Sequence, residues 1–233
     1  VYLACHVLGK TGFSRRNATI AVIILLLPLA FFKYTNFIFG SEVITYALPI
    51  GISFITFSGI AYVIDYYRGD YRKIEPFSVI LGYIVFFPQL VAGPIVKFRE
   101  LICQIPSAIA GTGHGTGVQN GVLLFSIGLF KKVIFADGVS VYATPVFDTA
   151  DAGGSLTFFE AWGGALAYTL QLYFDFSGYS DMAIGIAYMF GIKLPINFNS
   201  PYKSTSIIEF WRRWHMTLSR FLRDYLYIAL GGS

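Results

Sequence analysis

The stretch VITYALPIGISFITFSGIAYVI, residues 43–64, contains 22 residues in succession without a charged side chain. A helix rises about 1.5 Å per residue, so a helix of this length crosses the hydrocarbon core of a bilayer, which is about 30 Å thick. Other long apolar stretches lie on both sides of it. The sequence therefore predicts an all-α fold, a polytopic membrane bundle of helices.

The composition of the whole chain agrees with this prediction. Of its 233 residues, 55% are hydrophobic and 13% are charged, whereas a soluble domain carries about 25% charged residues. The apolar content excludes intrinsic disorder, and a net charge of only +4, spread over hydrophobic runs, excludes a nucleic-acid partner. The two cysteines, Cys5 and Cys103, have neither metal-ligand spacing nor a disulfide framework. We interpret both as buried thiols and expect no metal site.

Prolines interrupt two of the apolar segments. The segment 18–32 contains Pro28 and spans a membrane only if it continues to Phe39. The uncharged segment 77–96 contains Pro88 and the pair Gly93-Pro94. Proline inside a membrane helix frees backbone groups that only protein or water can satisfy. We therefore expect the segment 77–96 to be bent or re-entrant and to line a cavity.

Polar stretches separate the apolar segments. DYYRGDYRKIE, residues 65–75, is predicted to be a loop, and GTGHGTG, residues 111–117, to be a flexible connection. The apolar segment 182–192 is short, and we expect it only to dip into the bilayer.

The segment 207–230 carries half of the net charge of the chain. Drawn as one helix with about 100° between residues, it separates a charged side from an apolar side. Such a helix lies in the membrane interface with its basic side towards phosphates or water. The charged side holds Glu209, Arg212, Arg213, Arg220, Arg223 and Asp224, and the apolar side holds Ile207, Trp211, Trp214, Leu218, Leu222 and Tyr225.

His215 lies at the edge of the apolar side, one turn after Trp211 and one turn before Ser219. The pKa of histidine lies near neutral pH, and an ionisable group at membrane depth is a functional candidate. From the residues alone, two interpretations stay open: a packed interfacial histidine, and a general base or ligand.

Two further polar stretches are candidates for a site. In YFDFSGYSDMAIG, residues 173–185, Asp175 and Asp181 are six residues apart and do not share a helix face. A hydrogen-bonded structural turn is therefore favoured over catalysis by paired carboxylates. In LPINFNSPY, residues 194–202, Asn197 and Asn199 either line a polar tunnel or hold a loop in place.

Six blocks of the sequence form a recognisable ordered pattern. They are LPIGISFITFSGIAYVIDYYRG (48–69), FFPQLVAGPIVKF (86–98), GLFKKVIFAD (128–137), YFDFSGYSDMAIG (173–185), NFNSPY (197–202) and EFWRRWHMTLSRFLRDYLYIALGG (209–232). Together they resemble the membrane-bound O-acyltransferase family, and most closely its bacterial alginate O-acetyltransferase branch. The resemblance covers the chain from Leu48 to Ser233.

The resemblance implies an integral membrane enzyme whose helices, some re-entrant or interfacial, surround a central tunnel. Such enzymes move an acyl group, acetyl in the polysaccharide-modifying members, from a cytoplasmic donor such as acetyl-CoA to hydroxyl groups, with no bound cofactor. A site histidine of this branch matches His215 in WHMTLS, which makes His215 the candidate catalytic residue. Candidate tunnel residues are Trp211, Arg212, Arg213, Ser219, Asp175, Asp181, Asn197 and Asn199.

A second histidine, which the family carries farther along in an apolar segment, has no counterpart in this sequence. His6 and His114 lie far upstream in other contexts. We therefore expect residues 1–233 to be a fragment of one membrane-embedded domain, without the family's opening helices and C-terminal part, and to be inactive alone.

The resemblance also implies a location and partners. We expect a multi-pass protein of the bacterial inner membrane that contacts lipids, an acyl donor, a polysaccharide acceptor and an extracytoplasmic acyl-transfer protein. Two alternatives are a transporter or channel, which broken helices also suit, and a non-catalytic scaffold for an acyl-transfer partner.

Overall fold

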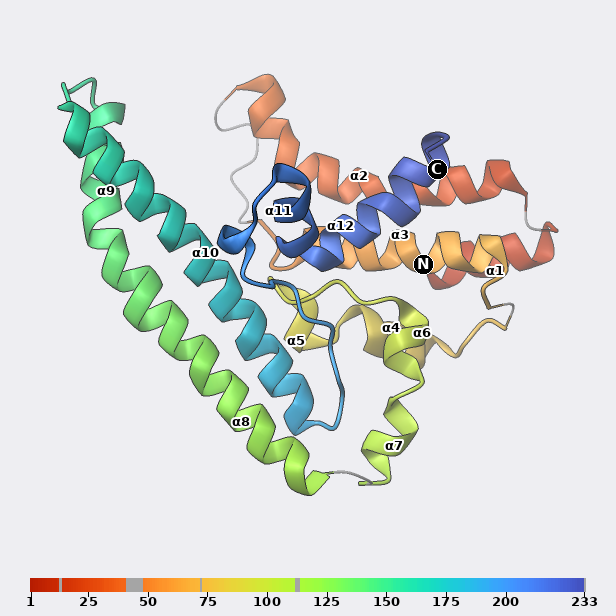
Figure 1. Ribbon diagram of the computed structural model, residues 1–233. Helices are drawn as coiled ribbons and strands as arrows, with labels where there is room; N and C mark the ends of the chain where they lie inside the picture. Colours follow the sequence, from red (N-terminus) through yellow and green to blue (C-terminus); the bar gives the residue numbers. More distant parts are fainter. Residues whose placement is uncertain (13, 41–47, 72, 112–113, 233) are drawn as a thin grey trace. The chain divides into compact units, whose positions relative to one another are not determined.

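The computed structural model describes residues 1–12, 14–40, 48–71, 73–111 and 114–232. Within these ranges the regular elements are all helical, as predicted (Figure 1). The chain divides into two compact units. The first unit comprises Val1–Val91, Ile95–Pro106 and Met216–Ser233, and the second comprises Ala92–Pro94 and Ser107–His215. That the chain forms a single domain stays a prediction.

The first unit begins with three helices that pack together. These are α1 (Tyr2–Lys10), α2 (Arg15–Phe39) and α3 (Ile52–Arg68). In Figure 1 the helix α2 runs beside α3, and α1 contacts both. The helix α2 continues through Pro28 to Phe39, so this segment has the length that we required of it for a membrane span. In the described part of the chain it is the one helix long and apolar enough to cross a membrane, so a polytopic arrangement stays a prediction.

The helix α3 differs at both ends from the span predicted over residues 43–64. Residues 43–47 lie outside the described ranges, and the helix begins at Ile52, after Gly51 in a left-handed conformation. It then continues four residues beyond Ile64, so the prediction of a loop from residue 65 is wrong at its start. Asp65 stays helical because it is buried and accepts a hydrogen bond of 2.8 Å from the Tyr225 hydroxyl.

The proline-containing segment 77–96 is broken, as predicted. It forms α4 (Phe77–Ile84) and the short α5 (Phe87–Leu90), followed by an irregular stretch. Tyr83 and Gln89 satisfy part of the released backbone: the Tyr83 hydroxyl donates to the Val96 carbonyl at 2.8 Å, and the Gln89 amide donates to the Tyr83 carbonyl at 3.0 Å. That the segment re-enters the membrane stays a prediction. The helices α6 (Phe98–Ile102) and α7 (Ile105–Ile109) follow.

The end of the chain returns to the first unit. The helix α12 (Met216–Leu222) continues into the π-helical turn η3 (Arg223–Tyr227) and the 3₁₀ turn η4 (Ile228–Leu230). Phe221 and Tyr225 enter a buried cluster with Ile60, Ala61 and Ile95. Polar contacts join the same elements: Arg220 contacts both carboxylate oxygens of Glu100 at 2.8 and 2.9 Å, Lys97 pairs with Asp224 at 2.8 Å, and the Thr217 hydroxyl accepts the Ile95 backbone N–H at 3.0 Å.

The second unit consists mainly of long helices. The helix α8 (His114–Phe130) passes through the π-helical turn η1 (Lys131–Ala136) into α9 (Asp137–Asp151), and α10 (Phe158–Met189) packs along all three (Figure 1). Because α8 begins at His114, the predicted flexible connection is shorter than residues 111–117. Of that connection, residues 112–113 lie outside the described ranges.

Glycines allow α8 and α10 to approach closely. A Cβ atom on Gly128 would lie 2.5 Å from the Gly178 carbonyl oxygen, and one on Gly121 would lie 2.6 Å from the Gly185 carbonyl oxygen. Small residues at such crossings are typical of helices that pack in membranes.

The prediction of a turn in residues 173–185 is wrong, because all of these residues lie inside α10. The prediction of a separate short segment over residues 182–192 is also wrong, because residues 182–189 continue the same helix. The small polar residues that suggested a turn are buried at helix contacts. Ser177 accepts a hydrogen bond from Lys131 at 3.1 Å, and Ser180 accepts one from Asn197 at 3.2 Å. The helix persists because tertiary partners satisfy these hydroxyls.

The prediction of one amphipathic helix over residues 207–230 is also wrong. The helix α11 (Ile207–Arg213) ends before Trp214, and α12 begins at Met216. Trp214 is extended, with φ −95° and ψ 127°, and His215 has a φ of +43°. The backbone therefore turns sharply at the residue singled out from the sequence.

Candidate active site

The candidate site in the second unit centres on His215, between α11 and α12. Its φ of +43° lies in the left-handed region, which is costly for a residue other than glycine. The Trp214 backbone N–H donates to the Phe210 carbonyl at 2.9 Å and closes α11. The His215 side chain is only 9% exposed. The break in the helix thus directs this imidazole into the second unit, against Asn197 and Phe176.

Asn197 holds one nitrogen of the His215 ring. Its Oδ1 lies 2.9 Å from His215 Nδ1, and its Nδ2 donates to Ser180 Oγ at 3.2 Å. Asn197 and Ser180 are both 1% exposed. Because the bond to Ser180 uses the amide nitrogen, the amide oxygen faces the ring and accepts a hydrogen from Nδ1. In the neutral imidazole, Nε2 is then the nitrogen with a lone pair.

Two aromatic rings flank the imidazole. Phe176 from α10 meets it edge to face at 4.7 Å, and Phe198 stacks on it at 6.2 Å with an interplanar angle of 25°. Burial lowers the pKa of His215 from its ordinary value of 6.5 to about 4. His215 lies outside the candidate span α2 and is neutral at pH 7.

The irregular segment between α10 and α11 keeps Asn197 in place. The Tyr202 hydroxyl donates to the Thr169 carbonyl on α10 at 2.9 Å, and the Asn199 backbone N–H donates to the Arg213 carbonyl on α11 at 3.0 Å. Trp214 packs against the rings of Tyr173 and Tyr202. Residues 197–202 therefore connect the two helices that carry the site.

Asp175 and Asp181 lie on α10 opposite the lysines of η1. Lys131 pairs with Asp181 at 2.5 Å, and Lys132 pairs with Asp175 at 2.6 Å and with Asp137 at 2.8 Å. The two aspartates are thus held by separate lysines, which supports the structural role favoured from their spacing. The sequence did not indicate which lysines pair with the two aspartates, because these partners lie 43 and 50 residues away along the chain.

The predicted arginine cluster is divided between the units and largely occupied by carboxylates. Arg213 pairs with Glu209 at 2.6 Å, while Arg212 and Trp211 are exposed on α11. In the first unit, Arg220 pairs with Glu100, Arg223 pairs with Asp224, and Ser219 is half-buried on α12. Among the described residues, Arg212 is the cation of α11 without an ion-pair partner.

Sequence reasoning identified His215 and Asn197 but did not pair them, and it missed Phe176, Ser180 and Phe198. Phe176 and Ser180 lie inside the 173–185 block, and Phe198 lies between the two candidate asparagines, so the motifs contained them without indicating their roles. The described residues contain no group of three or more histidine, cysteine or acidic side chains placed to hold a metal ion.

The histidine is buried between aromatic rings, and the described elements of the chain are all helical and include one candidate membrane span. These features agree with the comparison with family models. The model for MBOAT, the membrane-bound O-acyltransferase family, matches residues 74–233, which include all of the candidate site. The chain belongs to this family.

Curated relatives narrow the comparison. The peptidoglycan O-acetyltransferase of Helicobacter pylori is 41% identical over 100% of this chain and 50% of its own length. The probable alginate O-acetylase AlgI of Azotobacter vinelandii is 45% identical over 96% of this chain and 46% of its own length. A more distant relative, the teichoic acid D-alanyltransferase of Bacillus subtilis, is 31% identical over 97% of this chain and 57% of its own length. The chain thus spans about half the length of these relatives.

Proposed function

We propose that this chain is part of an O-acetyltransferase of the bacterial inner membrane, which moves acetyl from a cytoplasmic thioester donor such as acetyl-CoA to hydroxyl groups of a cell-surface polysaccharide. The observation that carries the proposal is the buried pair of His215 and Asn197 in a chain of this family. The relatives named for acetyl transfer, at 41% and 45% identity, favour acetyl over the alanyl group of the relative at 31%.

His215 is proposed to act through Nε2. Asn197 accepts the hydrogen of Nδ1, and the low pKa keeps the ring neutral, so Nε2 is able to accept a proton from an acceptor hydroxyl. As that proton moves to Nε2, the hydroxyl oxygen forms a bond to the thioester carbonyl carbon. The carbon–sulfur bond then breaks, and the departing sulfur takes the proton from the imidazolium. An ester and a free thiol result, and His215 is neutral again.

Arg212 is proposed to assist the donor. It is the exposed cation of α11 without a carboxylate partner among the described residues, whereas Arg213 is neutralised by Glu209. Phosphate groups of a CoA-type donor, or of a lipid, suit such a guanidinium. Asp175 and Asp181 are assigned to the scaffold of the second unit rather than to the chemistry.

The test is acetyl transfer by membranes that contain the intact protein with His215→Gln or His215→Ala. General-base catalysis contributes about 10²–10⁴-fold, so we expect a loss of that size in labelled acetyl transferred to alginate or to peptidoglycan, with unchanged expression and membrane insertion. His6→Gln is the matched control, since His6 is exposed on α1 and stacks on Tyr2. Full activity of both His215 variants would refute the assignment of His215 as the base. It would favour the alternative in which this chain is a non-catalytic scaffold and a partner protein transfers the acyl group.

A further inference from the structure

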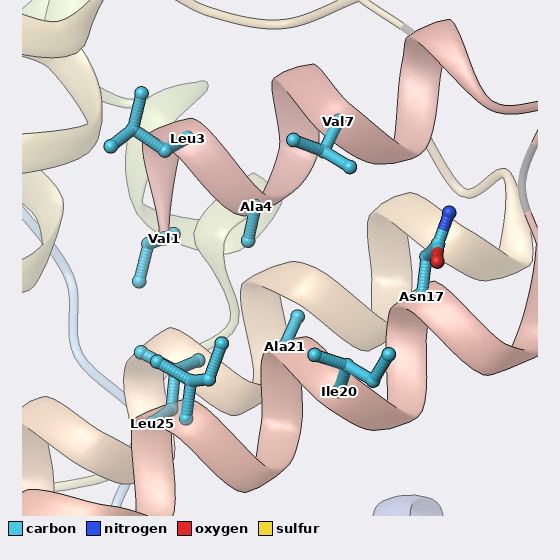
Figure 2. A pocket seen from close by; sticks show the side chains of 9 residues that line it. Val1, Leu3, Ala4, Val7, Asn17, Ile20, Ala21 and Leu25 are labelled. Carbon is cyan, nitrogen blue, oxygen red and sulfur yellow. The ribbon is translucent and has the colours of Figure 1, made fainter.

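The first unit carries an apolar groove that the proposed reaction does not use. It lies between α1 and α2 and encloses about 390 Å³. Figure 2 shows Ala4 of α1 and Ala21 of α2 pointing toward one another across it, with Asn17 at one end. Leu3 is 77% exposed and Ile24 is 58% exposed. The lining consists of Val1, Leu3, Ala4, Val7, Asn17, Ile20, Ala21, Ile24 and Leu25.

On each of the two helices, a basic residue lies at one end of the row of apolar side chains that line the groove. Lys10 follows Val7 by three residues and Leu3 by seven, which places it on the same face of α1. Arg16 precedes Ile20 by four residues, which places it one turn away, at the edge of the face of α2 that lines the groove. The two helices are antiparallel and joined by a short connection, so both cations lie at the end of the groove near Asn17. There the Asn17 amide donates to the Thr11 hydroxyl at 2.7 Å.

These cations have no acidic counterpart nearby in the sequence. Lys10, Arg15 and Arg16 are exposed, without an ion-pair partner among the described residues. Residues 1–41 contain no aspartate or glutamate. A groove that is apolar along its length and cationic at one end matches a molecule with an apolar chain and an anionic head.

We propose that the groove between α1 and α2 binds one anionic phospholipid, with an acyl chain against Val7, Ile20 and Ile24 and the headgroup phosphate at Lys10 and Arg16. A further protein helix would cover the apolar stripes but leave the two cations without a counter-charge. An anionic phospholipid satisfies both parts of the groove. The inference does not depend on His215 or on acyl transfer.

The test is photo-crosslinking of the intact protein in nanodiscs. The probes are phosphatidylglycerol and phosphatidylcholine that carry the same diazirine-labelled acyl chain, and mass spectrometry locates the crosslinked peptides. We expect phosphatidylglycerol to label α1 and the first half of α2 several-fold more than phosphatidylcholine does. Lys10→Gln and Arg16→Gln should each lower that labelling by about fivefold, and Ile20→Trp should abolish it by filling the groove.

Matched controls separate selective binding from general contact with lipid. Lys33→Gln removes a cation from the other end of α2, and Ile23→Trp adds the same bulk outside this groove; both should leave the labelling unchanged. Equal labelling by the two lipids, or labelling insensitive to Lys10 and Arg16, would overturn the proposal. Absence of label from α1 and α2 would also overturn it and would indicate that protein covers the groove.

Discussion

At the scale of single residues, the environment of His215 is unlike that of an exposed histidine. It lies in a left-handed backbone conformation, its Nδ1 faces an amide oxygen, and two phenylalanine rings flank it. The resemblance to the family identified His215 as the candidate, and the sequence also marked Asn197 as polar. That these two residues form a pair depends on the path of residues 190–206, which no local pattern encodes.

The pH dependence of transfer tests the role of Asn197. In the native protein the pKa of His215 is about 4, so the base is lost only when the pH falls to that region. Asn197→Asp places a carboxylate against Nδ1, and a nearby opposite charge favours the imidazolium form. The pKa of His215 should rise, and the acid limb of kcat/KM should move upward by at least about one pH unit.

The measurement is kcat/KM for acetyl transfer between about pH 3.5 and 8, a range that includes the acid limb of the native protein. Asn197→Ala is the comparison variant, because it removes the hydrogen bond without adding a charge and should lower the rate without raising the acid limb. An unchanged acid limb in Asn197→Asp would show that His215 is not the titrating base.

At the scale of elements, the hydrophobic pattern predicted helices but not all of their boundaries. The helix α2 is continuous through Pro28, as the candidate span required. The segment 77–96 breaks just before Pro88, which lies in the first turn of α5, where a missing backbone N–H is tolerated. The expected turn at 173–185 is helical because Lys131 and Asn197 satisfy Ser177 and Ser180. The segment 207–230 has a continuous amphipathic pattern, yet it is broken at Trp214 and His215. Contacts distant in sequence decided the last two cases.

The close packing of α8 on α10 leads to a prediction about two glycines. A Cβ atom on Gly128 would lie 2.5 Å from the Gly178 carbonyl oxygen, whereas one on Gly138 would meet nothing within 4 Å. Gly128→Ala should therefore lower the free energy of unfolding by about 1–3 kcal/mol through overpacking. Gly138→Ala should raise it by up to about 1 kcal/mol, since alanine has the higher helix propensity.

The measurement is the thermal unfolding midpoint of each purified variant in the same detergent. Gly138→Ala is the matched control, because it makes the same substitution in a helix of the same unit. Equal effects of the two substitutions would contradict the close approach of α8 and α10.

At the scale of the whole molecule, the burial of the two cysteines reflects how the first unit is packed. The interpretation of both as buried is correct for Cys5 and wrong for Cys103, which is exposed. Cys103 lies just after α6, beside polar residues such as Lys97 and Glu100, rather than in an apolar core. Burial raises the pKa of the Cys5 thiol to about 12.

Thiol labelling of the native protein should therefore be limited to one site within residues 1–233. A maleimide reagent should modify Cys103 in the folded protein and Cys5 only after denaturation, because the buried thiol is inaccessible and protonated. Intact-mass and peptide mass spectrometry give the stoichiometry and location. Cys103→Ser should abolish native labelling within residues 1–233, and rapid labelling of Cys5 in that variant would contradict the packing of α1.

The sequence by itself determined the helical class, the candidate span and the family, because composition, uncharged length and ordered motifs are local properties of the chain. It also determined that His215 is the residue to test. The tertiary structure alone decided that the last segment breaks at His215, that Asn197 and Ser180 fix one ring nitrogen, and that Phe176 and Phe198 enclose the ring. The physical reason is that the pKa and the orientation of a side chain depend on burial and hydrogen bonds from distant residues.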